Sequence, residues 1–67
     1  MRLDGARAIR DYLGWNESKF KKHLPSMRAA GVVLYEMRGR PAQRRMWSMT
    51  ELITLWLIKA GQEGKVF

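Results

Sequence analysis

The chain has no cysteine, one histidine and few acidic residues, and each shortage excludes a kind of chemistry. Without thiols it forms no disulfide, iron–sulfur cluster or thiolate zinc site, a composition compatible with a reducing compartment. His23 and six scattered carboxylates match no known metal-ligand spacing, so we expect no metal and no other cofactor. No motif places a nucleophile or carboxylate beside His23, and the six dispersed glycines form no phosphate-binding loop. We therefore expect neither catalytic residues nor a small-molecule substrate.

Long apolar runs are also missing. The most apolar stretch, Leu52 to Ile58, has seven residues and lies between Glu51 and Lys59. A membrane-spanning helix needs roughly 20 apolar residues. The first residues, Met1 to Gly5, are charged and lack the apolar region of a secretory signal. The sequence therefore predicts a cytoplasmic protein with no membrane partner.

Positive charge is abundant and unevenly distributed. Thirteen Lys and Arg against six Asp and Glu give a net charge of +7 and a pI of about 10.6, which favours an anionic partner such as nucleic acid. Residues 16–45 hold eight cations and two anions, a net charge of +6. The net charge is +1 over residues 1–15 and zero over residues 46–67. The middle segment is therefore the predicted partner-facing surface.

The hydrophobic content indicates a folded core. At 46% hydrophobic residues, the composition is too rich for a disordered basic tail. We expect one domain over residues 1–67, with residues 62–67 frayed. The expected fold is mainly α with a small β-hairpin.

Apolar residues at steps of three and four predict a first helix over residues 4–13. Asp4 is the expected cap of its first turn, and Gly14 suits the left-handed residue that ends a helix. The apolar face consists of Leu3, Ala6, Ile9 and Leu13.

A second helix is predicted to begin at Glu17, with Asn16 as its N-cap. Pro25 lacks an amide donor, so we expect the helix to stop or kink near Leu24, with a further turn running to Ala30. The inward face consists of Phe20, Leu24 and Met27.

The second half of the chain predicts a hairpin followed by a third helix. Residues 32–37 alternate as a strand does, residues 38–43 contain the Gly and Pro of a loop, and residues 44–47 are long enough for a returning strand. Ser48 and Glu51 fit a capping box, which predicts a helix over residues 52–60 with Gly61 past its end.

This order of elements resembles the winged helix-turn-helix domains of the MerR-like and excisionase-like families, a form shared by small phage regulators and phage terminase small subunits. The resemblance covers about residues 4 to 58. It is carried by Ala8-Ile9-Arg10-Asp11-Tyr12-Leu13-Gly14-Trp15-Asn16, Gly31-Val32-Val33 and Trp47-Ser48-Met49-Thr50-Glu51-Leu52. One departure is Arg10, where such motifs usually carry alanine, so this side chain must point aside or the packing must differ.

The resemblance implies that the second helix lies in the major groove of double-stranded DNA and that the hairpin forms a wing on the backbone or in the minor groove. A further phosphate candidate is Arg28. The candidate recognition residues are Asn16, Glu17, Ser18, Lys19, Lys21 and Lys22, and the candidate wing residues are Arg38, Arg40, Arg44 and Arg45.

Each of these residues also has a purely structural interpretation. Asn16 and Glu17 serve as cap and dipole partner, and lysines on a helix commonly form only a solvated face. Arginines on a hairpin can prevent edge-to-edge strand pairing. His23 is expected to be a half-buried helix residue rather than a ligand or base.

Two other functions remain open. The chain could bind RNA or single strands, with Trp47 and Tyr35 as stacking platforms. It could instead be a protein-interaction or dimerisation module, because the third helix is apolar over most of its circumference. The leading hypothesis is a sequence-specific DNA-binding protein of phage or bacterial regulatory type, acting alone, as a homodimer or in a larger regulatory or phage assembly.

Overall fold

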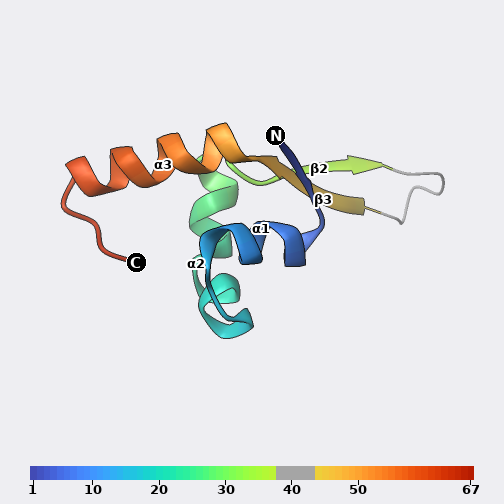
Figure 1. Cartoon of the computed structure of the whole chain (residues 1–67), viewed down its shortest axis with the longest axis horizontal. Helices are drawn as coiled ribbons and strands as arrows, with labels where there is room; N and C mark the ends of the chain where they lie inside the picture. Colours follow the sequence, from blue (N-terminus) through green and yellow to red (C-terminus); the bar gives the residue numbers. More distant parts are fainter. Residues whose placement is uncertain (38–43) are drawn as a thin grey trace.

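The computed structural model describes residues 1–37 and 44–67 of the 67-residue chain. These residues form three helices and one antiparallel sheet of three strands in the order β1-β3-β2 (Figure 1). The helices are α1 (Ala6–Leu13), α2 (Glu17–Ala29) and α3 (Thr50–Gln62), and the strands are β1 (Arg2–Asp4), β2 (Leu34–Met37) and β3 (Arg44–Met49). The expected mainly α architecture with a small β element is confirmed.

The sequence does not predict strand β1, which ends at Asp4, the residue where the first helix was expected to begin. Arg2 pairs with Met49, and Asp4 pairs with Trp47, so β1 forms an edge strand beside β3. Burial of Leu3 against the core favours this pairing. The chain then turns at Gly5, whose φ of 87° suits glycine, and α1 begins at Ala6. The prediction that Asp4 caps this helix is wrong.

Helix α2 runs through Pro25 to Ala29, so it does not stop near Leu24, and the further turn expected to reach Ala30 belongs to the same helix. Phe20 lies before Pro25 and Met27 lies after it, and both side chains are buried in the core. Burial of Met27 beyond the proline offsets the lost amide hydrogen bond, since burying a large apolar side chain contributes about 1.5–3 kcal/mol.

Helix α3 begins without the predicted capping box. Ser48 belongs to β3, and its buried hydroxyl donates to the Val32 carbonyl over 2.6 Å, so it cannot cap the helix. The N-cap residue is Met49, which makes no side-chain cap hydrogen bond. Gly61, expected past the helix end, lies inside α3.

The core lies where the helices meet the sheet. It contains Leu3, Ile9, Phe20, Met27, Val32, Val33 and Ile53. The inward positions predicted for Ile9, Phe20 and Met27 are therefore confirmed, whereas Ala6 is exposed. Because α1, α2 and α3 each contribute to one cluster, the core fixes how their solvent faces are presented.

Candidate nucleic-acid interface

The first half of α2 carries the predicted recognition residues. Asn16 caps the helix by accepting a 2.8 Å hydrogen bond from the Lys19 amide, which confirms its capping role. Ser18, Lys21 and Lys22 are exposed, and Lys21 lies 3.1 Å from the Glu17 carboxylate. The hydrogen bond from Lys21 lowers the pKa of Glu17, and the charges of Lys21 and Arg10 add to this effect.

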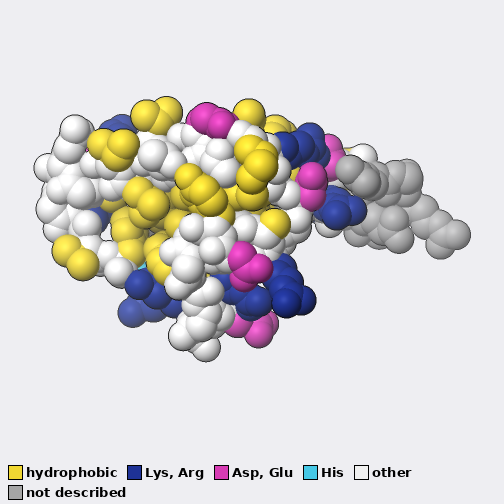
Figure 2. Space-filling model, in the orientation of Figure 1, with side chains coloured by type: hydrophobic (Ala, Val, Ile, Leu, Met, Phe, Trp, Pro, Cys, Tyr) yellow, Lys and Arg dark blue, Asp and Glu magenta, His cyan; other side chains and the backbone are white. Residues whose placement is uncertain are grey.

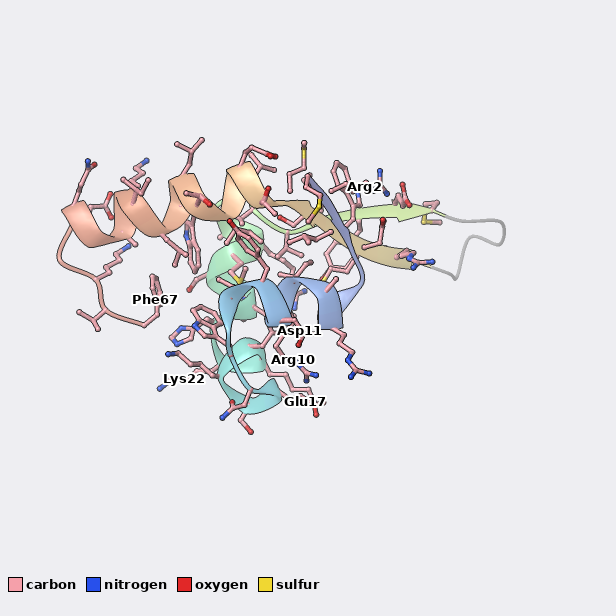
Figure 3. All side chains as sticks on the ribbon, viewed as in Figure 1. Arg2, Arg10, Asp11, Glu17, Lys22 and Phe67 are labelled. Atoms are coloured by element: carbon pink, nitrogen blue, oxygen red, sulfur yellow. The ribbon has the colours of Figure 1, made fainter. Side chains whose placement is uncertain are left out.

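Lys19 differs from its neighbours. It is half-buried, and its Nζ lies 5.2 Å from the centre of the Trp15 ring, a cation–π geometry. Lys22 extends into solvent at the other side of the helix from Glu17 (Figure 3). The structure therefore places Ser18 and Lys22 on the same side of α2 as Asn16 and Lys19, and places Lys21 beside Glu17.

Sequence reasoning missed Arg7 and Arg10 as interface residues, because residues 1–15 carry a net charge of only +1 and the predicted partner-facing surface begins at residue 16. A groove of about 330 Å³ between α1 and α2 is lined by both arginines and by Glu17 and Lys21, with Ala6, Phe20, Leu24 and Met46 as further walls. Arg10 is half-buried, and its side chain lines this groove between the two helices. The four-residue spacing of Arg7 and Asp11, whose charged atoms lie 4.0 Å apart, was the available signal of an outward charged face.

Basic side chains consequently gather on one side of the molecule, over α1 and α2 (Figure 2). Acidic side chains are interspersed among them, as expected from the Glu17 and Asp11 pairs. The surface is thus predominantly cationic, with acidic side chains among the basic ones, and its cations are suited to contact phosphates.

The hairpin presents a second set of arginines. Arg44 and Arg45 are exposed, and they lie opposite Met37 and Glu36 at the end of β3 where it pairs only with β2. The predicted hairpin is confirmed in these strands. The predicted wing residues Arg38 and Arg40 lie outside the described residues.

The side chain of Arg2, on β1, contacts residues of the other two strands, Glu36 on β2 and Trp47 on β3. Its guanidinium lies 2.7 Å from the Glu36 carboxylate and 4.3 Å from the centre of the Trp47 ring. The Glu36 hydrogen bond, followed by that to Asp4, raises the pKa of Arg2, which stays charged. Trp47 is half-buried beneath this cation. Arg28, the further phosphate candidate, is exposed and lies 6.0 Å from the Tyr35 ring centre.

An aromatic cluster connects the turn before α2 with the middle of α3 and with the last residue of the chain. Trp15, from the turn before α2, lies 6.4 Å from Trp56 of α3 and 5.2 Å from His23 of α2, measured between ring centres. Phe67 stacks on Trp56 at 4.7 Å and also contacts Trp15 and His23 (Figure 3). His23 is half-buried, as predicted.

The tail after α3 packs against this aromatic cluster. Gly64, with a φ of 78°, reverses the chain, and the Lys65 amide donates to the Ala60 carbonyl over 2.8 Å. This reversal returns Phe67 to the rings of Trp15 and Trp56. Burial of aromatic surface, which the apolar count of the tail did not reveal, holds it there.

Neither a metal cluster nor a membrane-spanning helix is found among the described residues. Residues 1–37 and 44–67 contain no cluster of three or more His, Cys, Asp or Glu side chains suited to a metal ion. No helix within those ranges has the length and apolar character needed to cross a membrane. Comparisons with protein-family models, curated proteins and solved structures find no match to this chain.

Proposed function

We propose that the chain is a nucleic-acid-binding protein. The observation that carries this proposal is the cationic face over α1 and α2, formed by exposed Arg7 and Lys21 with half-buried Arg10 between the helices, and by exposed Lys22 on the other side of α2. Clusters of Lys and Arg such as this one are suited to bind the phosphates of nucleic acids. Exposed Arg44 and Arg45 on the hairpin extend the cationic surface to a second element.

Within that class, we propose double-stranded DNA as the ligand and a winged helix-turn-helix as the binding form. Two helices joined by a turn at left-handed Gly14, followed by a hairpin, have the order of elements that such a domain requires. Helix α2 would enter the major groove through Asn16, Glu17 and Ser18, and Lys21 and Lys22 would contact flanking phosphates. The protein would then act as a transcriptional regulator, an excision factor or a packaging-recognition module.

Selection of bound duplexes from a random oligonucleotide pool tests this proposal and yields the target site. If about five phosphates are neutralised, the logarithm of affinity should fall with the logarithm of salt concentration at a slope of roughly −4 to −5. Salt-independent affinity, or the absence of binding to any duplex, would contradict the proposal.

The wing is tested separately by changing Arg38, Arg40, Arg44 and Arg45 to Ala together. The expected result is weaker binding with a shallower salt slope, because fewer phosphates are contacted. A quadruple variant with unchanged affinity would assign the binding to α1 and α2 alone.

Single-strand binding is the competing function, and Tyr35 is the feature that favours it. Tyr35 is 41% exposed, as a stacking platform requires. Trp47, the other ring of that hypothesis, is half-buried under Arg2. Competition between a selected duplex and its separate strands distinguishes the two functions: preference for single strands with tryptophan quenching would favour the alternative.

A further inference from the structure

The solvent face of α3 is apolar in its middle and charged at its ends. Leu55 is 64% exposed and Ile58 is 53% exposed, and residues three apart lie on one helix face. Glu51 and Lys59 flank them and are also exposed. Hydrophobic side chains are visible on the surface over α3 in Figure 2. This face lies opposite the buried residues Ile53 and Ala60.

Charge indicates which partner suits this face. The chain has a net charge of +7, but α3 contains one anion and one cation and is neutral. An acidic partner would be attracted to the cationic face of α1 and α2 instead. A second copy of this chain, by contrast, meets the least repulsion at α3.

The face is also complementary to itself. Glu51 and Lys59 are eight residues apart, or about 12 Å along a helix. Within its own chain, Glu51 binds the Met1 amine and Thr50 through Oε1. If two α3 helices meet in antiparallel orientation about a two-fold axis, the Glu51 carboxylate of each also faces Lys59 of the other. Leu55 and Ile58 then pack between the charges, where both copies supply apolar surface.

The face is too small to hold two free copies together. Stable interfaces bury about 800 Å² and 20–30 residues on each partner, and this stripe has four residues. Each copy also carries +7, which opposes association in free solution. DNA phosphates would neutralise much of that charge and hold two copies close together.

We propose that two copies associate through antiparallel α3 helices when they bind neighbouring, inverted sites on one DNA duplex. This inference rests on the proposed function, since it requires duplex binding. It adds a cooperative partner, a second copy of the chain, and assigns Leu55, Ile58, Glu51 and Lys59 to the contact between them.

The experiment compares duplexes that carry one selected site or two inverted copies of it, with centres separated by a series of spacings. At one helical turn, about 10 base pairs, or a multiple of it, the second copy should bind about tenfold more tightly than the first. Adding half a turn should remove the enhancement because the two proteins then lie on opposite sides of the duplex. Sedimentation without DNA should show a monomer.

Two pairs of matched variants locate the contact. Leu55→Ala should abolish the enhancement and leave single-site affinity unchanged, whereas Leu57→Ala, which truncates the same residue type on another side of α3, should preserve it. Lys59→Glu and Lys65→Glu change the net charge equally, so they share any general loss of DNA affinity. Only Lys59→Glu should abolish the enhancement, because it sets a carboxylate against Glu51 of the other copy.

The outcomes separate the two proposals. Single-site binding with no enhancement at any spacing would overturn the α3 contact and leave the proposed function intact. Equal loss of the enhancement in Lys59→Glu and Lys65→Glu would also overturn it. A dimer in the absence of DNA would contradict the dependence on DNA, and failure to bind any duplex would overturn both proposals.

Discussion

Helices α2 and α3 are each 13 residues long, and each buries two residues seven positions apart: Phe20 and Met27 in α2, Ile53 and Ala60 in α3. Their solvent faces nevertheless differ. Helix α2 carries four Lys and Arg and one Glu, a net +3, whereas α3 carries one Lys and one Glu. Packing in the core therefore requires buried residues at the same spacing in both helices, and it does not constrain the residues on their outer faces. Partner choice is determined by those outer faces.

The largest expected effect comes from the core that both helices share. Ile53→Ala should cost about 2–5 kcal/mol of unfolding free energy, since Ile53 is fully buried. A domain of this size has about 3–5 kcal/mol in total, so both outer faces should be lost together. Urea unfolding followed by tryptophan fluorescence measures the loss. Ile53→Val should cost only about 0.5–1.5 kcal/mol, and an equal loss in both variants would contradict the cavity explanation.

The next effect concerns the link between the end of α2 and the start of α3. Ser48→Ala removes the hydroxyl that donates to the Val32 carbonyl, which leaves a buried acceptor unpaired and should cost about 1–3 kcal/mol. Ser18→Ala, at an exposed position of α2, is the matched control and should have little effect. Similar unfolding midpoints for the two variants would show that the buried hydrogen bond contributes nothing.

The tail forms the other connection between the two helices. Phe67→Ala removes ring contacts with Trp15, His23 and Trp56, and the loss of a half-buried aromatic should cost about 1–2 kcal/mol. Tryptophan emission should shift to longer wavelength as the rings become hydrated. Phe67→Leu should restore part of the stability, while an unchanged emission spectrum in Phe67→Ala would contradict docking of the tail.

The difference between the two outer faces can be measured through salt dependence. Lys22→Ala should reduce the magnitude of the salt slope for DNA binding by about 1, because one phosphate contact is lost. Lys59→Ala removes the same charge from α3 and should leave the slope for single-site binding unchanged. The slopes come from anisotropy titrations at several salt concentrations, and equal slopes for the two variants would refute the assignment of DNA contact to α2.

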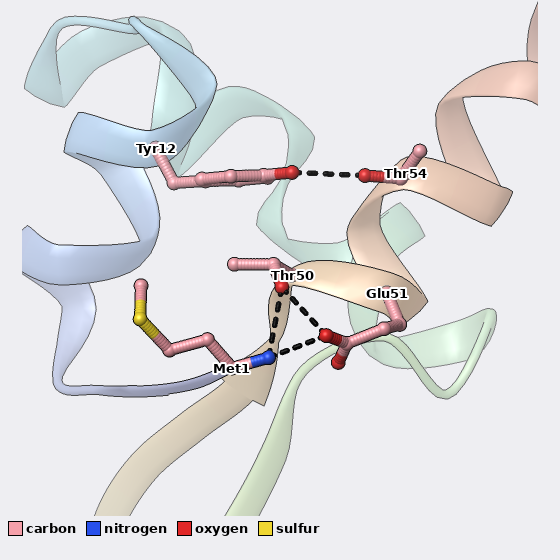
Figure 4. Close-up of polar contacts among 5 residues, drawn as sticks. All are labelled: Met1, Tyr12, Thr50, Glu51 and Thr54. Atoms are coloured by element: carbon pink, nitrogen blue, oxygen red, sulfur yellow. Dashed lines mark hydrogen bonds and ion pairs between the residues drawn. The ribbon is translucent and has the colours of Figure 1, made fainter.

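The smallest expected effect is acid sensitivity at the two helix starts. Hydrogen bonds from Lys21 to Glu17, and from the Met1 amine to Glu51, lower the pKa of each carboxyl (Figure 4 shows the Glu51 contacts). A carboxyl whose pKa is lower in the folded state stabilises the fold above its unfolded pKa of about 4.3. That stability is lost as the pH falls through the lowered pKa. Glu17→Gln and Glu51→Gln should each flatten the decline of stability below about pH 4.3, measured by urea unfolding across pH. An unchanged pH profile would contradict this.

Local patterns predicted most of the helices and the hairpin. The steps of three and four in α1, the Asn16 cap and left-handed Gly14 all act within a few residues, so the sequence expresses them directly. Ser48 shows where this reasoning failed. Its local capping motif was outcompeted by a buried hydrogen bond to Val32, 16 residues away.

The candidate interface was partly predictable for the same reason. Lys21 and Lys22 follow from the periodicity of α2, because exposure of a helix face is a local property. Arg7 and Arg10 could not be assigned to that surface, since their proximity to α2 depends on how two helices cross. The contacts of all these residues with DNA remain predictions.

The sequence by itself determined the net charge of +7, its concentration in residues 16–45, the lack of metal-ligand spacing and the positions of the main helices. Charge is a sum over residues, and ligand spacing and helix positions depend on residues close together in the sequence. Only the tertiary structure decided that β1 joins β3, that Phe67 returns to Trp56, and that α3 presents Leu55 to solvent. Each of these depends on which distant apolar groups share a core, a choice made by the packing of the whole chain.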